Sequence, residues 1–202
     1  MNKECRLVNQ DEFELIIKTL ANGYVDNGIV RKRNEQMAVI LTCEANLGCR
    51  LNDILSLKLE SFKTYENRVM INIVEQKTKK TRFFTCSMAF YNFLLDYCMR
   101  NNITNKKQKI FTIHDRGVQK NLRQVCRYLE RENLITNGDM IGSHSFRKKF
   151  ATDAYFRSGK NIALVTKLLQ HSSTAVSLAY IKMNEKELEE LLINNTNIPT
   201  FT

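Results

Sequence analysis

The sequence GSHSFR, at residues 142–147, predicts the first turn of a helix. Ser143 is a suitable N-cap, because its hydroxyl accepts a backbone N–H that the first turn leaves unpaired. His144 and Arg147 lie three residues apart and therefore share one face of the helix. The imidazole titrates near neutral pH, and the guanidinium is a permanent cation with a fork of donors suited to phosphate. Two phenylalanines on an adjacent stripe anchor this helix in a core. The stretch predicts a base and a phosphate clamp on one helix, although a solvated helix edge is the alternative.

The composition of the whole chain is that of a folded protein. Its 202 residues are enough for one large domain or two small ones, and 43% are hydrophobic and 26% charged. A single proline and seven glycines favour helices over a turn-rich β fold. We find no internal repeat, no flexible linker, no apolar run of about 18 residues and no apolar segment at the start. We therefore expect a protein of the cytoplasm with neither a membrane span nor a secretion signal.

The charge and the cysteines narrow the class of protein further. A net charge of +10 indicates a polyanionic partner, for which nucleic acid is the first candidate and mere solubility the alternative. No two cysteines form a CxxC pair, so we expect buried free thiols in a reducing compartment and no zinc site. The six cysteines are Cys5, Cys43, Cys49, Cys86, Cys98 and Cys126.

Hydrophobic periodicity predicts a mainly α chain with a small antiparallel β-sheet, an α+β fold. Apolar residues recur at helical spacing in stripes at 13–20, 37–45, 90–97, 118–129, 162–169, 176–183 and 188–192. From residue 68 to residue 86 the period changes to two, which predicts a β-hairpin with a lysine-rich turn. We expect Gly23, Gly48 and Gly159 to end helices and Asn52 to cap a short one.

Several basic residues have two interpretations from their positions alone. Arg50 stands at a junction between two helices, where it either caps backbone carbonyls or serves a site. The lysines of the hairpin turn either protect a sheet edge or reach a ligand. A basic row on the 118–129 helix either tracks a phosphate backbone or forms a solvated face. This row comprises Arg116, Lys120, Arg123 and Arg127.

The order of these residues, with their flanking sequence, resembles the tyrosine recombinase (phage integrase) family over residues 8–193. LGCRLNDILSL resembles the first arginine box of that family, and VEQKT resembles its hairpin lysine. HSFRKKFAT resembles the H-x-x-R box, and LLQHSST resembles the last box, with the usual nine-residue step from His171 to Tyr180. These segments are residues 47–57, 74–78, 144–152 and 168–174.

The chain departs from the family in three respects. Lys148 stands where histidine is common, and Gln170 stands where glycine is usual, but neither position carries the chemistry. The family usually has a separate N-terminal core-binding domain, which we do not find in these 202 residues. We expect residues 1–202 to be a single catalytic domain, either a fragment or a naturally short member like the fimbrial inversion recombinases. A helix at 184–193 would pack on its own chain or exchange between protomers.

The resemblance implies a reaction and a role for each residue. Tyr180 would attack a DNA phosphorus and hold the 3′ end as a phosphotyrosine. Arg50, Arg147 and His171 would stabilise the charge of the transition state, with His144 as general base and Lys77 as general acid. The resemblance implies no metal, no other cofactor and no ATP. Further candidate contacts to the DNA backbone are Arg31, Lys32, Arg33, Lys79, Lys80, Lys120, Arg123 and Arg127.

The implied function is site-specific recombination or integration for a mobile element, or DNA inversion. The partners would be double-stranded DNA and further copies of the chain, as a tetramer on synapsed DNA and a monomer when free. Two alternatives remain open from the sequence. One is a type IB topoisomerase-like enzyme that relaxes DNA, and the other is a DNA-binding regulator with the same fold and no catalysis.

Overall fold

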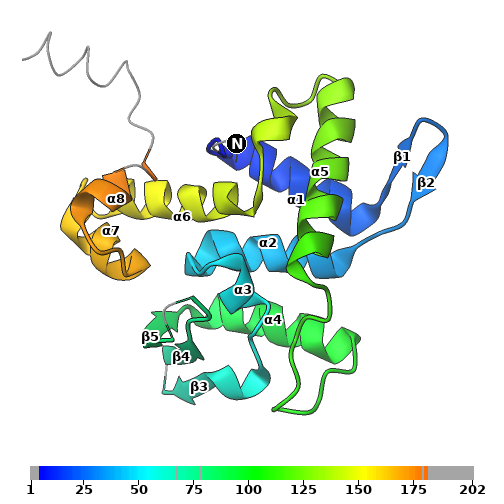
Figure 1. Cartoon of the computed structure of the whole chain (residues 1–202). Coiled ribbons are helices and arrows are strands. Elements are labelled where there is room, and N and C mark those ends of the chain that lie inside the picture. Colours follow the sequence, from blue (N-terminus) through cyan, green and yellow to red (C-terminus); the bar gives the residue numbers. More distant parts are fainter. Residues whose placement is uncertain (1–4, 67, 78, 179, 182–202) are drawn as a thin grey trace, which may run out of the picture.

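Helix α2 lies at the centre of the fold. The computed structural model describes residues 5–66, 68–77, 79–178 and 180–181 (Figure 1). Helix α2 (Glu35–Leu47) is apolar around most of its circumference and packs between α1 (Gln10–Asn22) and α6 (Ser143–Arg157). The remaining helices are α3 (Leu51–Ile54), α4 (Met88–Arg100), α5 (Asp115–Arg131), α7 (Ile162–Leu169) and α8 (Thr174–Leu178). The expected mainly α fold with small antiparallel sheets is confirmed.

A three-stranded antiparallel sheet lies beside this helical layer, with α4 packed against it (Figure 1). The central strand β4 (Arg68–Val74) pairs with β3 (Phe62–Tyr65) and β5 (Thr81–Cys86). Along β4, Val69, Ile71 and Ile73 are buried and alternate with exposed residues, because successive side chains of a strand point to opposite faces. The predicted hairpin is confirmed, and β3 was not predicted.

A second, two-stranded hairpin was also not predicted. It consists of β1 (Tyr24–Asp26) and β2 (Ile29–Arg31) and projects from the body of the molecule (Figure 1). Its sequence signal was Asn27-Gly28, both of which have positive φ, as a tight hairpin turn requires. Strands of three residues are too short for an alternating pattern to reveal them.

The apolar residues form two separate clusters. The large one is built from α1, α2, α4, α5, the sheet and the start of α6. The small one contains Ala151 of α6, Val165 and Leu169 of α7, and Ile181. Helix α6 reaches both, since Phe146 is buried in the first cluster and Ala151 in the second. The small cluster therefore carries α7 and α8 as an appendage of the main body.

Two predicted caps are wrong. Helix α6 has Gly142 as its N-cap, and Ser145 rather than Ser143 accepts the N–H of that residue, at 3.2 Å. The short helix α3 begins at Leu51, so Arg50 and not Asn52 is its N-cap. The side chains of Ser143 and Arg50 bond to distant residues instead of capping, since Ser143 accepts from Gln119 at 2.9 Å and Arg50 donates to Glu75 at 2.9 Å.

The C-terminal part of the predicted pattern is partly wrong. Helix α8 ends at Leu178, so Tyr180 follows the helix instead of lying within it. Val176 is 40% exposed and Ser177 is fully buried, the reverse of the predicted stripe. The predicted helix at 184–193 lies outside the described residues.

The remaining sequence expectations can be stated briefly. Cys43, Cys49, Cys98 and Cys126 are free and buried as expected, while the other two cysteines are free and partly exposed. None of the described helices is both long and apolar enough to cross a membrane. Gly48 ends α2 with φ 57°, as predicted.

Candidate active site

Arg147, one turn into α6, is almost completely buried with 1% exposure. One end of its guanidinium donates to the carbonyl of Gly48, the residue that ends α2. Its Nη2 donates to the carbonyl of Leu169, the last residue of α7, at 3.1 Å. Carbonyls at helix C-termini lack partners within their helix and carry partial negative charge, which compensates a buried cation. Arg147 thus fastens the ends of two helices from different apolar clusters.

Arg50 enters the same region from the start of α3. Its Nη1 lies 2.9 Å from Oε2 of Glu75, a carboxylate with 1% exposure at the end of β4, while 23% of the Arg50 side chain is exposed. The side-chain hydrogen bond described for Arg50 is the one to this carboxylate. Among the described residues, Arg50 therefore does not cap a helix carbonyl. The position of Arg50 between α2 and α3 therefore sets the direction of its side chain, and the ion pair with Glu75 fixes it.

His171 lies beside Arg147, directly after the left-handed residue that ends α7. Its Nε2 is 3.3 Å from Nη2 of Arg147, and its Nδ1 is 3.0 Å from Oγ of Ser177. Burial, followed by the charges of Arg147 and Arg50, lowers the pKa of His171 to about 4. The preceding Gln170 has φ 52°, which explains why glycine suits this position.

Tyr180 closes the pocket. Its ring centroid is 4.8 Å from that of His171 and 6.4 Å from that of His144. The guanidinium carbon of Arg147 lies 5.9 Å from the centre of the Tyr180 ring. The described conformation therefore has Tyr180 beside the two histidines and the buried arginine.

His144 and Lys77 complete the set. Burial, followed by the charges of Arg147 and Arg50, lowers the pKa of His144, and Lys77 contributes in the same direction. Lys77 lies exposed in the turn between β4 and β5. The structure thus brings Arg50, His144, Arg147, His171 and Tyr180 together, with Lys77 near enough to affect His144 electrostatically.

Arg82 on β5 is a neighbour of the site that the sequence analysis missed. It is 3% exposed, donates from Nη1 to Sγ of Cys49 at 3.4 Å and donates from Nη2 to the carbonyl of Leu168. It therefore joins the residue before Arg50 to the end of α7. Its signal in the sequence was the alternation of β5, which places Arg82 on the inner face with Phe84.

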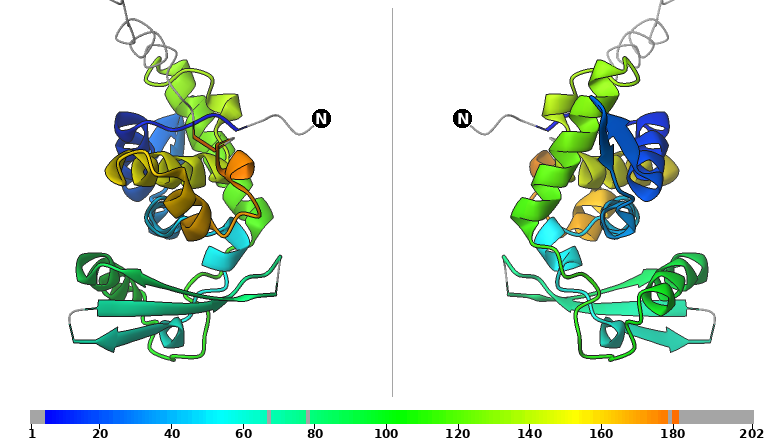
Figure 2. Two further views of the ribbon diagram at one scale, coloured as in Figure 1. Left: turned by 90° about the vertical axis from the view of Figure 1, so that its left-hand side faces the viewer. Right: turned by 90° about the vertical axis from the view of Figure 1, so that its right-hand side faces the viewer.

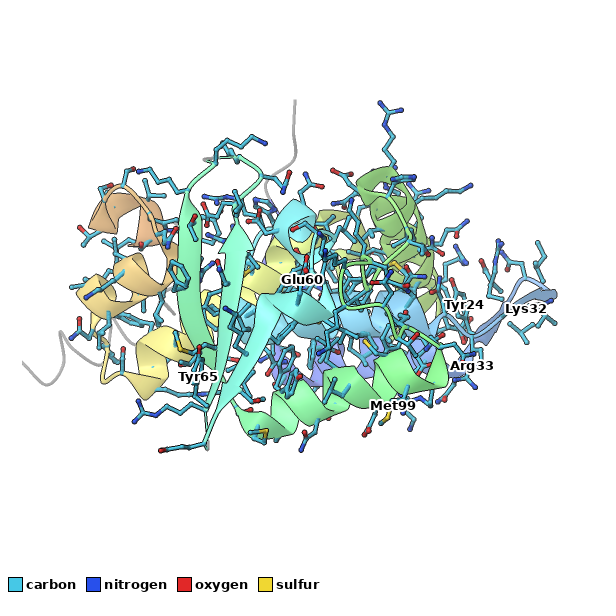
Figure 3. All side chains as sticks on the ribbon, turned by 90° about the horizontal axis from the view of Figure 1, so that it is seen from below. Tyr24, Lys32, Arg33, Glu60, Tyr65 and Met99 are labelled. Atoms are coloured by element: carbon cyan, nitrogen blue, oxygen red, sulfur yellow. The ribbon has the colours of Figure 1, made fainter. Side chains whose placement is uncertain are left out.

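The predicted DNA-backbone residues fall into three places. Lys120, Arg123 and Arg127 line a hollow of about 400 Å³ along α5, and the expected basic row is exposed. Lys79 and Lys80 are exposed in the β4–β5 turn. Figures 2 and 3 show α3, α8 and this turn on one side of the molecule, with α1 and α4 on the opposite side.

The third group lies at the β1–β2 hairpin. Figure 3 places Lys32 and Arg33 at the end of the molecule away from α7 and α8. Arg31 lies 3.9 Å from Asp26, and Arg33 lies 3.5 Å from Glu35. These residues are therefore remote from the pocket that holds Tyr180.

Comparison with known proteins provides an independent line of evidence. The model of the phage integrase family matches residues 6–187. A probable integrase/recombinase of Acholeplasma phage L2 is 27% identical over 140 residues, covering 69% of this chain and 46% of that protein. The tyrosine recombinase XerC of Corynebacterium glutamicum is 24% identical over 186 residues, covering 91% of this chain and 59% of that protein. The chain therefore spans about half the length of these two relatives.

Solved structures show the same fold. XerH site-specific recombinase, bound to a palindromic difH substrate in a post-cleavage complex, aligns with a TM-score of 0.69 at 19% identity and covers 95% of this chain and 53% of that one. The catalytic domain of bacteriophage HP1 integrase aligns with a TM-score of 0.58 at 17% identity and covers 95% of this chain and 96% of that one.

Proposed function

The chain belongs to the phage integrase family, and from that premise we propose that it is a site-specific DNA recombinase acting through a covalent 3′-phosphotyrosyl intermediate on Tyr180. The observation that carries this proposal is the clustering of these side chains around Tyr180. A tyrosine, two arginines and two histidines from four separate segments meet there, and each belongs to a box that resembles the family.

The cleavage step follows from the chemistry of these groups. The Tyr180 oxygen attacks the phosphorus, a new P–O bond forms to the tyrosine, and the bond to the 5′ oxygen breaks. Because its pKa is lowered, His144 is unprotonated at neutral pH and can take the proton of the tyrosine hydroxyl. Lys77 gives a proton to the departing 5′ oxygen. Rejoining reverses these transfers with a different 5′ hydroxyl, and the energy of the bond is kept in the phosphotyrosine.

The two arginines stabilise the extra charge that the phosphoryl oxygens gain. Arg147 is held rigidly between two helix ends, so its direction changes little during the reaction. Arg50 is partly exposed and paired with Glu75, so it can turn a free face to the phosphate while that carboxylate fixes its position. The guanidinium forks are thus prepared before the DNA arrives, which is what electrostatic catalysis requires.

Double-stranded DNA is the substrate that the charge distribution supports. The exposed row on α5 and the lysines of the β4–β5 turn provide phosphate contacts that set affinity and salt dependence more than sequence choice. Recombination also requires two DNA sites to be held together, for which we propose a homotetramer on synapsed DNA.

A covalent adduct tests this proposal. A nicked duplex from the junction of the parent element traps the protein, because the cut fragment diffuses away. Wild type should form an adduct that resists denaturation, and Tyr180→Phe should form none. Tyr155→Phe is the matched control, because Tyr155 packs on the same small cluster and has no proposed role in the reaction.

Other outcomes would contradict the proposal. An adduct that persists in Tyr180→Phe would place the nucleophile elsewhere. Binding of the duplex without any adduct would favour a catalytically silent DNA-binding regulator. Relaxation of supercoiled DNA by a monomer, without strand exchange between two sites, would favour the topoisomerase alternative.

A further inference from the structure

His171 is one member of a chain of hydrogen bonds that runs from Arg147 into the small apolar cluster. Beyond His171, Oγ of Ser177 lies 2.8 Å from Oγ1 of Thr166, which in turn lies 2.8 Å from the carbonyl of Ile162. Ser177 is fully buried. Its hydroxyl therefore cannot form a hydrogen bond with solvent, and His171 and Thr166 are its described hydrogen-bond partners.

The direction of this chain follows from what each group can donate. A guanidinium has donors and no acceptor, so the Nε2 that faces Arg147 must be the accepting nitrogen. A neutral imidazole then carries its proton on Nδ1 and donates it to Oγ of Ser177. The Oγ1 of Thr166 lies 2.8 Å from two acceptors, Oγ of Ser177 and the carbonyl of Ile162, and it has one hydrogen to donate. We assign that hydrogen to the carbonyl, so that Thr166 accepts the hydroxyl hydrogen of Ser177.

The opposite direction of hydrogen-bond donation does not fit the geometry. It would set an Nε2–H against a guanidinium N–H, and both groups would be donors. It would also require the single hydroxyl hydrogen of Thr166 to serve both Ser177 and the carbonyl of Ile162. The geometry thus selects one tautomer of His171.

We propose that Ser177 and Thr166 are positioning residues that hold His171 as its Nδ1–H tautomer, and that His171 takes up a proton at Nε2 when a DNA phosphate enters the pocket. This inference rests on the proposed function for the identity of the phosphate. With its lone pair facing the pocket, Nε2 cannot donate to a phosphate oxygen. Protonation from solvent turns it into a donor, and Oγ of Ser177 still accepts from Nδ1 in the cation.

The surrounding charges explain why the proton arrives with the phosphate. Arg147 from α6, Arg50 at the start of α3 and Arg82 from β5 disfavour a cation at His171, and Glu75 favours one. These causes, with burial the largest, keep the free protein's His171 neutral. A phosphate between the arginines adds negative charge at the one place where it offsets them.

The first experiment reads the tautomer in the free chain and needs no activity. NMR spectra of ¹⁵N-histidine protein distinguish a protonated ring nitrogen from a bare one, and His171→Gln assigns the signals among the three histidines. Wild type should show a protonated Nδ1 and a bare Nε2. Ser177→Ala should leave Nδ1–H without its acceptor, so the resonance of this proton should move upfield and its exchange with solvent should become faster, whereas Ser172→Ala, at an exposed neighbour of His171, should change neither. A protonated Nε2 in wild type, or an unchanged Nδ1 proton in Ser177→Ala, would overturn the proposal.

The second experiment follows single-turnover cleavage against pH at saturating duplex. Without Oγ of Ser177 the cation loses its acceptor, so the pKa of His171 in the complex falls. The cleavage rate of Ser177→Ala should be about tenfold below that of wild type at pH 8, because one pKa unit changes the protonated fraction about tenfold. At pH 6 the difference should be smaller. The affinity for the duplex should be unchanged. Ser177→Thr, which keeps the hydroxyl, should keep the wild-type profile.

The outcomes separate the two proposals. A deficit in Ser177→Ala that is equal at every pH would refute proton uptake at His171. Absence of a Tyr180 adduct in wild type would refute the proposed function, and with it the phosphate step, while the NMR result would still decide the roles of Ser177 and Thr166.

Discussion

Gly48 is the position where one added methyl group should disturb both the fold and the site. Its φ of 57° lies in the left-handed region, where an alanine costs about 1 kcal/mol. A Cβ there would also lie 2.2 Å from Cδ1 and 2.4 Å from Cε1 of Phe150. Overpacking of this kind costs about 1–3 kcal/mol. Gly48→Ala should therefore lower the free energy of unfolding by about 2–4 kcal/mol.

A double-mutant cycle separates the two contributions. In a Phe150→Ala background the ring is absent, so Gly48→Ala should cost only the backbone part, about 1 kcal/mol. The coupling measured by urea unfolding of the four proteins should thus be about 1–3 kcal/mol. Adduct formation should fall in Gly48→Ala and recover in part in the double variant, because the Gly48 carbonyl holds Arg147. An equal cost in both backgrounds would show that Phe150 is not the obstacle, and the packing argument would fail.

Two further predictions concern buried charges. Glu44 is fully buried on α2, and burial raises its pKa well above the ordinary value, although the charge of Arg147 acts in the opposite direction. Glu44 therefore ionises at lower pH in the unfolded chain than in the folded one. The free energy of unfolding falls as pH rises above about 4.3. Glu44→Gln removes this loss, so its stability relative to wild type in urea unfolding should improve from pH 4 to pH 8, and an unchanged difference would contradict the assignment. Arg82→Met removes the donor to the Leu168 carbonyl and should destabilise the chain by about 1–3 kcal/mol. Hydrogen exchange should become faster at the end of α7, but remain unchanged in the control Arg68→Met, at an exposed position of β4. Equal exchange in both variants would argue against Arg82 as a link.

The main helices could be predicted because one apolar stripe each was enough to reveal them. The stripe at 118–129 corresponds to five buried residues of α5, and the stripe at 37–45 corresponds to the core of α2. The stripe at 176–183 failed for a physical reason. Burying Ser177 requires partners for its hydroxyl, and His171 and Thr166 provide them, so a serine faces the interior where the pattern favoured Val176.

The candidate site could be predicted as a set of residues but not as a geometry. Local motifs carry the side chains that face the pocket, and a box such as HSFR contains its own spacing. The groups that hold them are distant in sequence. Glu75 holds Arg50 across 25 residues, and the Gly48 carbonyl holds Arg147 across 99. Sequence periodicity does not predict such partners, because each contact forms only when α2, α6 and the sheet are packed together.

These distant contacts also fix the position of the part of the site on the large cluster relative to the part on the small cluster. Arg50 and Lys77 stand on segments whose apolar residues pack in the large cluster, whereas His171 and Tyr180 stand on the appendage around the small one. Among the described residues this small cluster has four buried apolar side chains, so it provides little hydrophobic stabilisation of its own. Arg147 and Arg82 bridge the gap by donating to adjacent carbonyls, of Leu169 and Leu168, at the end of α7. A buried arginine is a costly way to join two bodies unless each donor finds an acceptor. Here the carbonyls of a helix end supply the acceptors, so Arg147, which we propose to clamp the phosphate, also sets the position of the histidine beside it.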